Sequence, residues 1–300
     1  MARDIVLLVN PIAGGTRGLR VLAPVVDRLA DGGARIRVLH GHGQKDSRDL
    51  AYAAVSERPD ALVIVGGDGL VHLALQAAVD TEVPVGIVPA GGGNDIARVL
   101  GVPDDPVAAA EIILDGVVRA MDAGRCGGEW FASVLCAGFD ARVSARVNRM
   151  TRLHGRARYL AGLAAELKTF APIPFAIELD GEEWRTEAML VAVGNTSTYG
   201  AGMRVCPQAR PDDGTFDVTV VGRVSRAELV RVFPLIYTGG HVRHPAVTTA
   251  RARIVSLTAP GLTAYADGEP AARLPVTCET VPGAWRVFVP EGNISAAPNV

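Results

Sequence analysis

The segment GGDG places a carboxylate between glycines: Asp68 follows Gly66 and Gly67 and precedes Gly69. A strand-like apolar run comes before the segment and a helix-like run comes after it. In such turns the backbone amides at a helix N-terminus bind phosphate, and glycine lets the phosphate approach the main chain closely. A carboxylate in that place would repel the phosphate unless a cation lies between them. The pattern therefore indicates a Mg²⁺ ion, bound to nucleotide phosphates, beside Asp68.

Two other glycine-rich segments follow strand-like runs, NPIAGG at residues 10–15 and PAGGGND at residues 89–95. Taken singly, each of the three segments is explained equally well as a tight connection between a strand and a helix. Together they favour a shared phosphate-binding edge, because the loops at the carboxyl ends of parallel strands form the usual ligand site of an α/β sheet.

Lysine is almost absent from the chain. Lys45 and Lys168 are the two lysines among 30 basic residues, and neither follows a glycine loop. P-loop NTPases need a lysine at the end of GxxxxGK[ST], and protein kinases need one on a VAIK-like strand. The sequence therefore excludes both of these nucleotide-binding sites.

The elements that position the three loops lie within residues 1–122, where short apolar runs alternate with amphipathic segments. Continuous apolar runs are typical of parallel strands that are covered on both faces. We predict an α/β nucleotide-binding domain with a doubly wound parallel sheet. Its predicted strands are DIVLLVN, ARIRVLH, ALVIV and VPVGIVP, and its predicted helices span residues 17–29, 47–56, 71–79 and 94–100.

Residues 123–287 alternate apolar and polar positions between DG and PG turns, which predicts a mainly antiparallel β second domain. Two helical stretches interrupt it, at residues 157–170 and 227–237. The last predicted strand, residues 285–289, either closes the second domain or returns to the first. In the second case residues 288–300 belong to the first domain.

Composition and charge exclude several classes of function. A formal net charge of −2 gives no reason to expect nucleic acid as a partner. No apolar run approaches the roughly 20 residues needed to cross a bilayer, and the run after the charged start is too short for a signal peptide. The four cysteines are scattered without metal-binding spacing, which favours free buried thiols. We expect a cytoplasmic protein.

The three glycine segments carry a family resemblance. VNPIAGG, GGDGLVHLALQA and PAGGGNDIARVLGVP resemble the NPxSG, GGDGT and PxGTxNDFAR motifs of the diacylglycerol kinase catalytic family, which includes soluble bacterial lipid kinases and sphingosine kinases. GFDARV, RYLAGL, YGAGMRVCPQARPDDGTFDV and YADGEP resemble later blocks of the family in the same order, so the resemblance covers nearly the whole chain. NAD kinases and phosphofructokinases share the GGDG turn, but their neighbouring motifs differ.

The resemblance implies an ATP-dependent lipid kinase that forms phosphatidic acid from diacylglycerol, with the lipid bound by the second domain. It implies that Glu269, in ADGE, is the base that takes the proton from the lipid hydroxyl, and that Asp68 lies on the nucleotide and Mg²⁺ side. Without the resemblance, ADGE is better explained as an Asp-Gly hairpin turn. The implied ATP-binding residues are Asn10, Pro11, Ala13, Gly14, Gly41, Gly66, Gly67, Gly69, Gly91, Gly92, Asn94 and Asp95.

The segment RPDDGTFD resembles a family stretch that holds a structural metal, partly through main-chain carbonyls. This implies Arg210, Asp213 and Thr215 as metal ligands, although the family usually has leucine where Thr215 stands. The alternative for this segment is an acidic surface turn.

An arginine-rich stretch lies between Asp140 and Glu166 and contains no acidic residue. A solvated helix face is the commoner meaning of such a stretch. For an enzyme with a lipid substrate we expect instead a patch that faces an anionic membrane, and hence peripheral membrane association; a homodimer is left open. The patch comprises Arg142, Arg146, Arg149, Arg152, Arg156 and Arg158.

Several family hydroxyl groups are missing. Ala13, Leu70 and Gly92 stand where the family has serine or threonine, and Gly41 aligns less closely with a further threonine. Each lost hydrogen bond to a charged group is worth about 1.5–3 kcal/mol. The chain is therefore either a working lipid kinase with an altered nucleotide site or a weakened binding and regulatory protein of the same fold. The retained carboxylates favour the kinase. A sphingoid base or another alcohol is the alternative acceptor.

Overall fold

The computed structural model describes residues 2–10, 17–148, 150, 161–162, 165 and 171–292. The chain divides into two compact units: unit 1 is Met1–Asp122 with Pro282–Val300, and unit 2 is Ala123–Val281. Strands β5 (Val118–Cys126) and β15 (Val276–Phe288) each begin in one unit and end in the other. Each unit is described below by itself.

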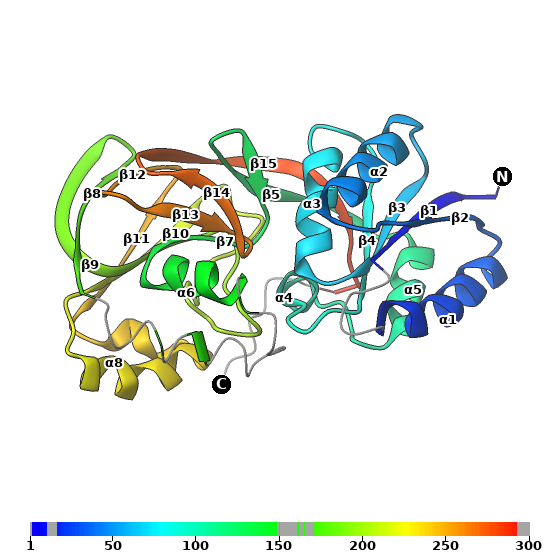
Figure 1. The fold of residues 1–300 in the computed structure, drawn as a ribbon. Helices are drawn as coiled ribbons and strands as arrows, with labels where there is room; N and C mark the ends of the chain where they lie inside the picture. The colour runs from blue at the N-terminus through cyan, green and yellow to red at the C-terminus, as the bar shows by residue number, and fades with distance from the viewer. Residues whose placement is uncertain are drawn as a thin grey trace. The chain divides into compact units, whose positions relative to one another are not determined.

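Unit 1 is built on a parallel sheet of β1 (Asp4–Val9), β2 (Arg35–His40), β3 (Ala61–Gly66) and β4 (Val85–Pro89), in the order β4-β3-β1-β2 (Figure 1). The end of β15 adds to β4 in parallel. All residues of β3 and β4 are buried, as their continuous apolar sequences predict.

The sheet has a topological switch point between β1 and β3, because the chain runs outward from these two strands in opposite directions. Ligands of doubly wound folds bind at this point, outside the carboxyl ends of the strands. Helices α1 and α5 contact each other, as do α2 and α3. The helices are α1 (Arg17–Asp31), α2 (Gln44–Ser56), α3 (Asp68–Ala78), α4 (Asp95–Val99) and α5 (Pro106–Asp115).

Helix α5 shows how local sequence sets helix boundaries in unit 1. The Asp105 carboxylate accepts a hydrogen bond from the Ala108 N–H at 2.8 Å, and Pro106 occupies the first helical turn. Gly116, at φ 73°, ends the helix in the left-handed conformation that glycine adopts most easily.

Unit 2 is an antiparallel β domain. The long strand β9 (Glu182–Gly194) pairs with β8 (Ile173–Leu179) along its first half and with β7 (Val134–Gly138) and β10 (Phe216–Gly222) along its second half. The other strands are β6 (Glu129–Phe131), β11 (Val247–Ala252), β12 (Ile254–Thr258), β13 (Thr263–Ala266) and β14 (Glu269–Arg273).

Helical segments accompany these strands: α6 (Phe139–Asn148), α8 (Arg226–Val232) and the 3₁₀ helices η1 (Phe233–Tyr237) and η2 (Gly240–Arg243). The predicted helix at residues 227–237 is observed as α8 followed by η1. The predicted helix at residues 157–170 lies largely outside the described residues.

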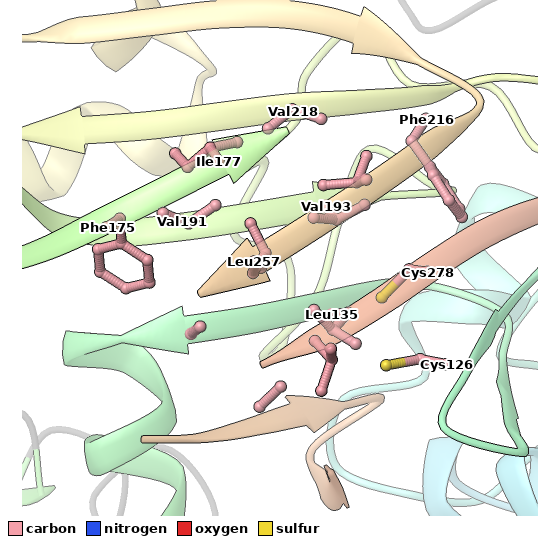
Figure 2. Packing of buried hydrophobic residues seen from close by; sticks show 14 of the residues in the cluster. Cys126, Leu135, Phe175, Ile177, Val191, Val193, Phe216, Val218, Leu257 and Cys278 are labelled. Atoms are coloured by element: carbon pink, nitrogen blue, oxygen red, sulfur yellow. The ribbon is translucent and has the colours of Figure 1, made fainter. Parts of the chain in front are cut away.

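The core of unit 2 forms where the inward-facing residues of these strands meet (Figure 2). The rings of Phe131 and Phe216 stack with their centroids 5.6 Å apart. Cys126 and Cys278 are buried in this core as free thiols, and Cys136 and Cys206 are also free and buried. The predicted fold class, an α/β domain joined to a mainly antiparallel β domain, is confirmed.

Candidate nucleotide and phosphoryl-transfer sites

The carboxyl edge of the unit 1 sheet brings the GGDG and GGGND segments together. Each predicted nucleotide-binding residue that the structure describes follows one of the four parallel strands at this edge. Asn10 follows β1, Gly41 follows β2, Gly66 ends β3 and precedes Gly67 and Gly69, and Gly91, Gly92, Asn94 and Asp95 follow β4. Pro11, Ala13 and Gly14 lie outside the described residues.

Gly67 and Gly91 are in direct backbone contact. A Cβ atom added to Gly91 would lie 2.5 Å from Gly67 Cα and 2.9 Å from Asn94 Oδ1. Since Cβ atoms do not approach backbone atoms so closely, the GGDG and GGGND turns pack in this way only with glycine at residue 91. The GGDG and GGGND turns therefore pack as one unit. Two independent tight connections would not need this contact.

Polar side chains hold the two turns together. The Asp68 carboxylate accepts a hydrogen bond from the Ile96 N–H at 3.1 Å, which links the start of α3 to the start of α4. Asn94 is in the left-handed conformation, at φ 54°, and its Oδ1 accepts from the Gly91 N–H at 2.9 Å. Its Nδ2 lies 3.3 Å from Asp104 Oδ1. Asp68 and Asn94 therefore shape the edge of the sheet, whatever ligand they also bind.

Arg98 was not among the predicted site residues. Its guanidinium donates to Asp95 Oδ1 at 2.7 Å and to the Gly93 carbonyl at 2.8 Å, so it is fixed beside the glycine turn. About half of its side chain is exposed, whereas Asp95 is buried. A guanidinium is well suited to bind phosphate. The sequence signal that could have identified Arg98 is its place at the end of the NDIAR segment.

The missing hydroxyl groups differ in their surroundings. Leu70 is 5% exposed and packs over Gly66, so its side chain points into the fold. A Cβ on Gly41 would lie 2.0 Å from Ser47 Oγ, so a hydroxyl from α2 already occupies the place of a side chain at residue 41. The space beside Gly92 is open to 4 Å. Of these three positions, Gly92 is the one with open space for the missing side chain, because Ser47 fills the place beside Gly41 and residue 70 carries a buried leucine.

In unit 2, the ADGE segment forms a hairpin turn between β13 and β14. Asp267 and Gly268 both have positive φ, 52° and 88°, as in the two-residue turns that favour Asp-Gly. The Asp267 carboxylate accepts hydrogen bonds from the Ala132 N–H at 2.9 Å, the Ser133 N–H at 2.8 Å and the Ser133 hydroxyl at 2.6 Å. Asp267 therefore fastens the hairpin to the β6–β7 connection.

Glu269 is the first residue of β14 and is half-buried. Within the described part of the chain, no residue forms a hydrogen bond or an ion pair with its carboxylate. Buried Asn195, which sequence reasoning missed, donates to the Ala132 carbonyl at 2.8 Å and supports the same connection. The two acids of ADGE thus differ in role: Asp267 holds the turn, and Glu269 is available for chemistry.

Comparison with known proteins decides the family. The diacylglycerol kinase catalytic domain model matches residues 4–126, and the YegS C-terminal NAD kinase beta sandwich-like domain model matches residues 133–289. A diacylglycerol kinase of Mycobacterium tuberculosis is 41% identical over 290 residues, which is 94% of each chain. This chain belongs to the diacylglycerol kinase family. A diacylglycerol kinase of Bacillus subtilis is 27% identical over 84% of each chain.

Solved structures of other proteins have the same fold as this chain. A crystal structure from Bacillus anthracis superposes with a TM-score of 0.81 at 25% identity and covers 96% of both chains. A further structure, of a diacylglycerol kinase from the same organism, gives a TM-score of 0.75 at 22% identity. Membership of the diacylglycerol kinase family makes this protein a lipid kinase.

In the stretch implied to hold a metal, Asp213 and Thr215 are bound by the guanidinium of Arg251 from β11. Asp213 Oδ1 accepts hydrogen bonds from the Thr215 N–H at 3.2 Å and the Thr215 hydroxyl at 2.9 Å, and the Arg251 guanidinium binds Asp213 Oδ2 and the Thr215 hydroxyl. Arg251 Nε also lies 3.6 Å from Asp217 Oδ2. In the described residues no three His, Cys, Asp or Glu side chains form a metal-sized group. The Asp213 carboxylate is thus paired with Arg251 and Thr215, and the metal ligands that the resemblance implies, Arg210, Asp213 and Thr215, stay a prediction.

An apolar hollow in unit 2 was not predicted from the sequence. Helices α8 and η1 contribute Leu229, Val232 and Phe233 to one side, and Phe139 and Met189 lie on the other. The volume of the hollow is about 60 Å³. Its lining comes from seven separate helices and strands, so no local sequence pattern marks it. Such a lining suits a hydrocarbon chain.

His241 is the ionisable residue in the lining of the hollow. It is 3% exposed, and its Nε2 lies 3.1 Å from the Val205 carbonyl, which assigns the proton to Nε2. Burial lowers the pKa of His241, although the Val205 carbonyl acts in the opposite direction. At neutral pH the imidazole is therefore uncharged.

This lowered pKa predicts acid sensitivity of unit 2. Below the unfolded-state pKa of about 6.5, the unfolded chain binds a proton that the folded protein resists, so stability falls as pH decreases toward the folded pKa. We expect the free energy of unfolding to decrease less between pH 7 and pH 5 in His241→Gln than in wild type. Urea unfolding at both pH values measures it, with exposed His42→Gln as the control. Equal slopes in wild type and His241→Gln would contradict the assignment.

Proposed function

We propose that this protein transfers the γ-phosphate of ATP to the hydroxyl of a lipid, with diacylglycerol as the acceptor and phosphatidic acid as the product. The observation that carries the proposal is the division of roles in the ADGE hairpin. Asp267 holds the turn through three hydrogen bonds, whereas the neighbouring Glu269 carboxylate has no hydrogen-bond or ion-pair partner in the described part of the chain. A base of this kind orients the attacking hydroxyl and accepts its proton.

The nucleotide side of the reaction is assigned to unit 1. The amides of the joined GGDG and GGGND turns and the N-terminus of α3 supply donors for phosphate oxygens. Arg98, fixed at the same edge, adds positive charge. The carboxylate of Asp68 is of the chemical type that holds Mg²⁺, and when bound this ion neutralises charge on the transferring phosphoryl group. No lysine is needed in such a site.

The lipid side is assigned to unit 2, where the apolar hollow would take the end of an acyl chain. Its lining is apolar apart from Tyr199 and His241, and the neutral imidazole adds no charge there. Burial of each methylene from water stabilises a bound chain by about 0.8 kcal/mol. This assignment predicts that the hollow controls chain-length preference.

Val232→Trp tests that assignment. Val232 lines the hollow from α8, and an indole in its place fills space that an acyl chain would use. We expect kcat/KM for long-chain diacylglycerol to fall by about tenfold, because filling a site of this kind removes chain-binding energy. Dihexanoylglycerol, whose short chains need less of the hollow, serves as the internal control. A uniform loss with both substrates would show damage outside chain binding.

The proposed reaction is tested by transfer of labelled γ-phosphate from ATP to a panel of lipids. The panel contains diacylglycerol, monoacylglycerol, a sphingoid base and a polyprenol, with Glu269→Gln as the inactive comparison. Labelled phosphatidic acid as the main product supports the proposal. Label on another acceptor would identify a different substrate and would still demonstrate kinase activity.

A second candidate function is a binding or regulatory protein with little catalysis. It is favoured by Leu70, which is turned into the fold, and by the open space beside Gly92, where the family hydroxyl is missing. Thermal unfolding with and without Mg-ATP separates the two functions. No stabilisation by any nucleoside triphosphate, together with no labelled product, would favour the regulatory protein.

A further inference from the structure

Helices α8 and η1 have two contrasting apolar faces. One face lines the hollow through Leu229, Phe233 and Ile236. The opposite face is exposed and is named here the α8–η1 face. It comprises Arg226, Val230, Arg231, Pro234, Leu235 and Tyr237.

The α8–η1 face exposes far more hydrocarbon than is usual for so short a segment. Val230 is 60% exposed, Leu235 44% and Tyr237 42%, and none of the α8 residues is buried. The described part of the chain has six large exposed apolar side chains, and three of them lie within residues 230–237. Exposed apolar residues gathered on one surface mark a site that binds another apolar surface.

The charge around this face is positive. Arg226 and Arg231 lie on it, and Arg223 and Arg243 flank its segment in sequence. The one acid between residues 223 and 243 is Glu228. Its carboxylate accepts a hydrogen bond from the Ser225 N–H at 3.1 Å, in the box that caps α8. Glu228 keeps its negative charge in the cap and also lies 3.9 Å from His244 Nε2, so the charged side chains of the α8–η1 face itself are its two arginines.

A ring contact connects the two faces. Tyr237, on the exposed face, packs edge-on against Phe233, which lines the hollow, with ring centroids 6.3 Å apart. An occupant of the α8–η1 face would thus lie one aromatic layer from the hollow. The adjacent α6 carries exposed Arg142 and Arg146 of the predicted arginine patch, and its Phe139 lines the same hollow. Arg149, Arg152, Arg156 and Arg158 lie outside the described residues.

We propose that the α8–η1 face docks on the surface of an anionic phospholipid bilayer, which places the hollow one aromatic layer from the membrane. The proposal rests on the proposed lipid-kinase function, because that function requires a substrate that resides in a bilayer. Val230, Leu235 and Tyr237 insert at the level of the headgroups, and Arg226 and Arg231 bind lipid phosphates. Apolar residues combined with arginines are the composition of interfacial helices, whereas protein interfaces do not require the positive charge.

Vesicle cosedimentation tests the surface without relying on catalysis. We expect Leu235→Asp and Tyr237→Asp to reduce binding to phosphatidylcholine vesicles containing about one third phosphatidylglycerol by about tenfold or more. Leu19→Asp and Tyr52→Asp are matched controls, because Leu19 and Tyr52 are both 46% exposed on helices of unit 1. Arg226→Gln with Arg231→Gln should lower binding to that on phosphatidylcholine alone. Undiminished binding of the α8–η1 variants, or an equal loss in the controls, overturns the proposal.

A substrate comparison separates failure of the surface from failure of the function. The Leu235→Asp and Tyr237→Asp variants should lose phosphorylation of long-chain diacylglycerol in vesicles and keep phosphorylation of monomeric dihexanoylglycerol. Loss with both substrates would show that these side chains act in the site itself and would overturn the docking role. If wild type phosphorylates neither substrate, the proposed function fails, and the vesicle result alone then decides whether the α8–η1 face binds membranes.

Discussion

Glu269→Gln is expected to lower kcat for phosphoryl transfer by about 10²–10⁴-fold, the range that a positioned general base contributes. Glutamine has nearly the same shape as glutamate but does not accept the proton of the attacking hydroxyl. The loss should appear in kcat rather than in KM for ATP, because the nucleotide is assigned to unit 1 and Glu269 belongs to unit 2. Initial rates at saturating lipid and ATP measure it.

The fold should tolerate the Glu269→Gln substitution. The hairpin is held by Asp267 through three hydrogen bonds to Ala132 and Ser133, and the Glu269 carboxylate contributes none of them. The variant should therefore unfold at the same temperature as wild type. Asp267→Ala is the contrasting control, since it leaves buried donors unsatisfied and should reduce the free energy of unfolding by about 1–3 kcal/mol. A Glu269→Gln enzyme with wild-type kcat would remove Glu269 from the reaction.

The architecture of unit 1 was predictable because its signals are local. The continuous apolar runs of β1, β3 and β4 mark buried parallel strands, and the glycines after them mark the turns at the carboxyl edge. The alternating strands of unit 2 were predictable for the same reason. In both units the period of the apolar residues gives the type of element without knowledge of its partners.

The details of the two sites depend on residues far apart in the chain. Asp267 binds Ser133, 134 residues away, so the structural role of this carboxylate leaves no local pattern. Gly41 aligns with a threonine of the family, so the sequence suggests a missing side chain at this position. Only the structure shows that the Ser47 hydroxyl lies in its place. Arg251 likewise reaches Asp213 from another strand and pairs with the carboxylate that the motif assigned to a metal. Motifs locate a site, but long-range contacts decide what each residue does there.

Gly91→Ala is expected to separate the two phosphate-binding turns and to cause a large loss of nucleotide affinity. The new Cβ would lie 2.5 Å from Gly67 Cα, and a backbone atom at the junction of β3 and α3 has no rotamer by which it can move aside. Relief requires a shift of the main chain, and overpacking of this kind lowers stability by about 1–3 kcal/mol. We expect the variant to show a lower Tm and, by calorimetric titration, more than about tenfold weaker binding of Mg-ATP.

Gly92→Ala provides the matched control one residue away. Gly92 lies in the same loop, has no atom within 4 Å of the added Cβ and is not in the positive φ region. Its substitution should change the free energy of unfolding by no more than about 0.5 kcal/mol and leave nucleotide affinity nearly unchanged. The loss in Gly91→Ala therefore comes from the contact between the turns and not from reduced flexibility of a glycine-rich loop. Equal losses in both variants would show that loop flexibility, rather than the Gly67 contact, sets nucleotide affinity. In that case the joined turns would no longer explain how this chain binds a nucleotide without a lysine.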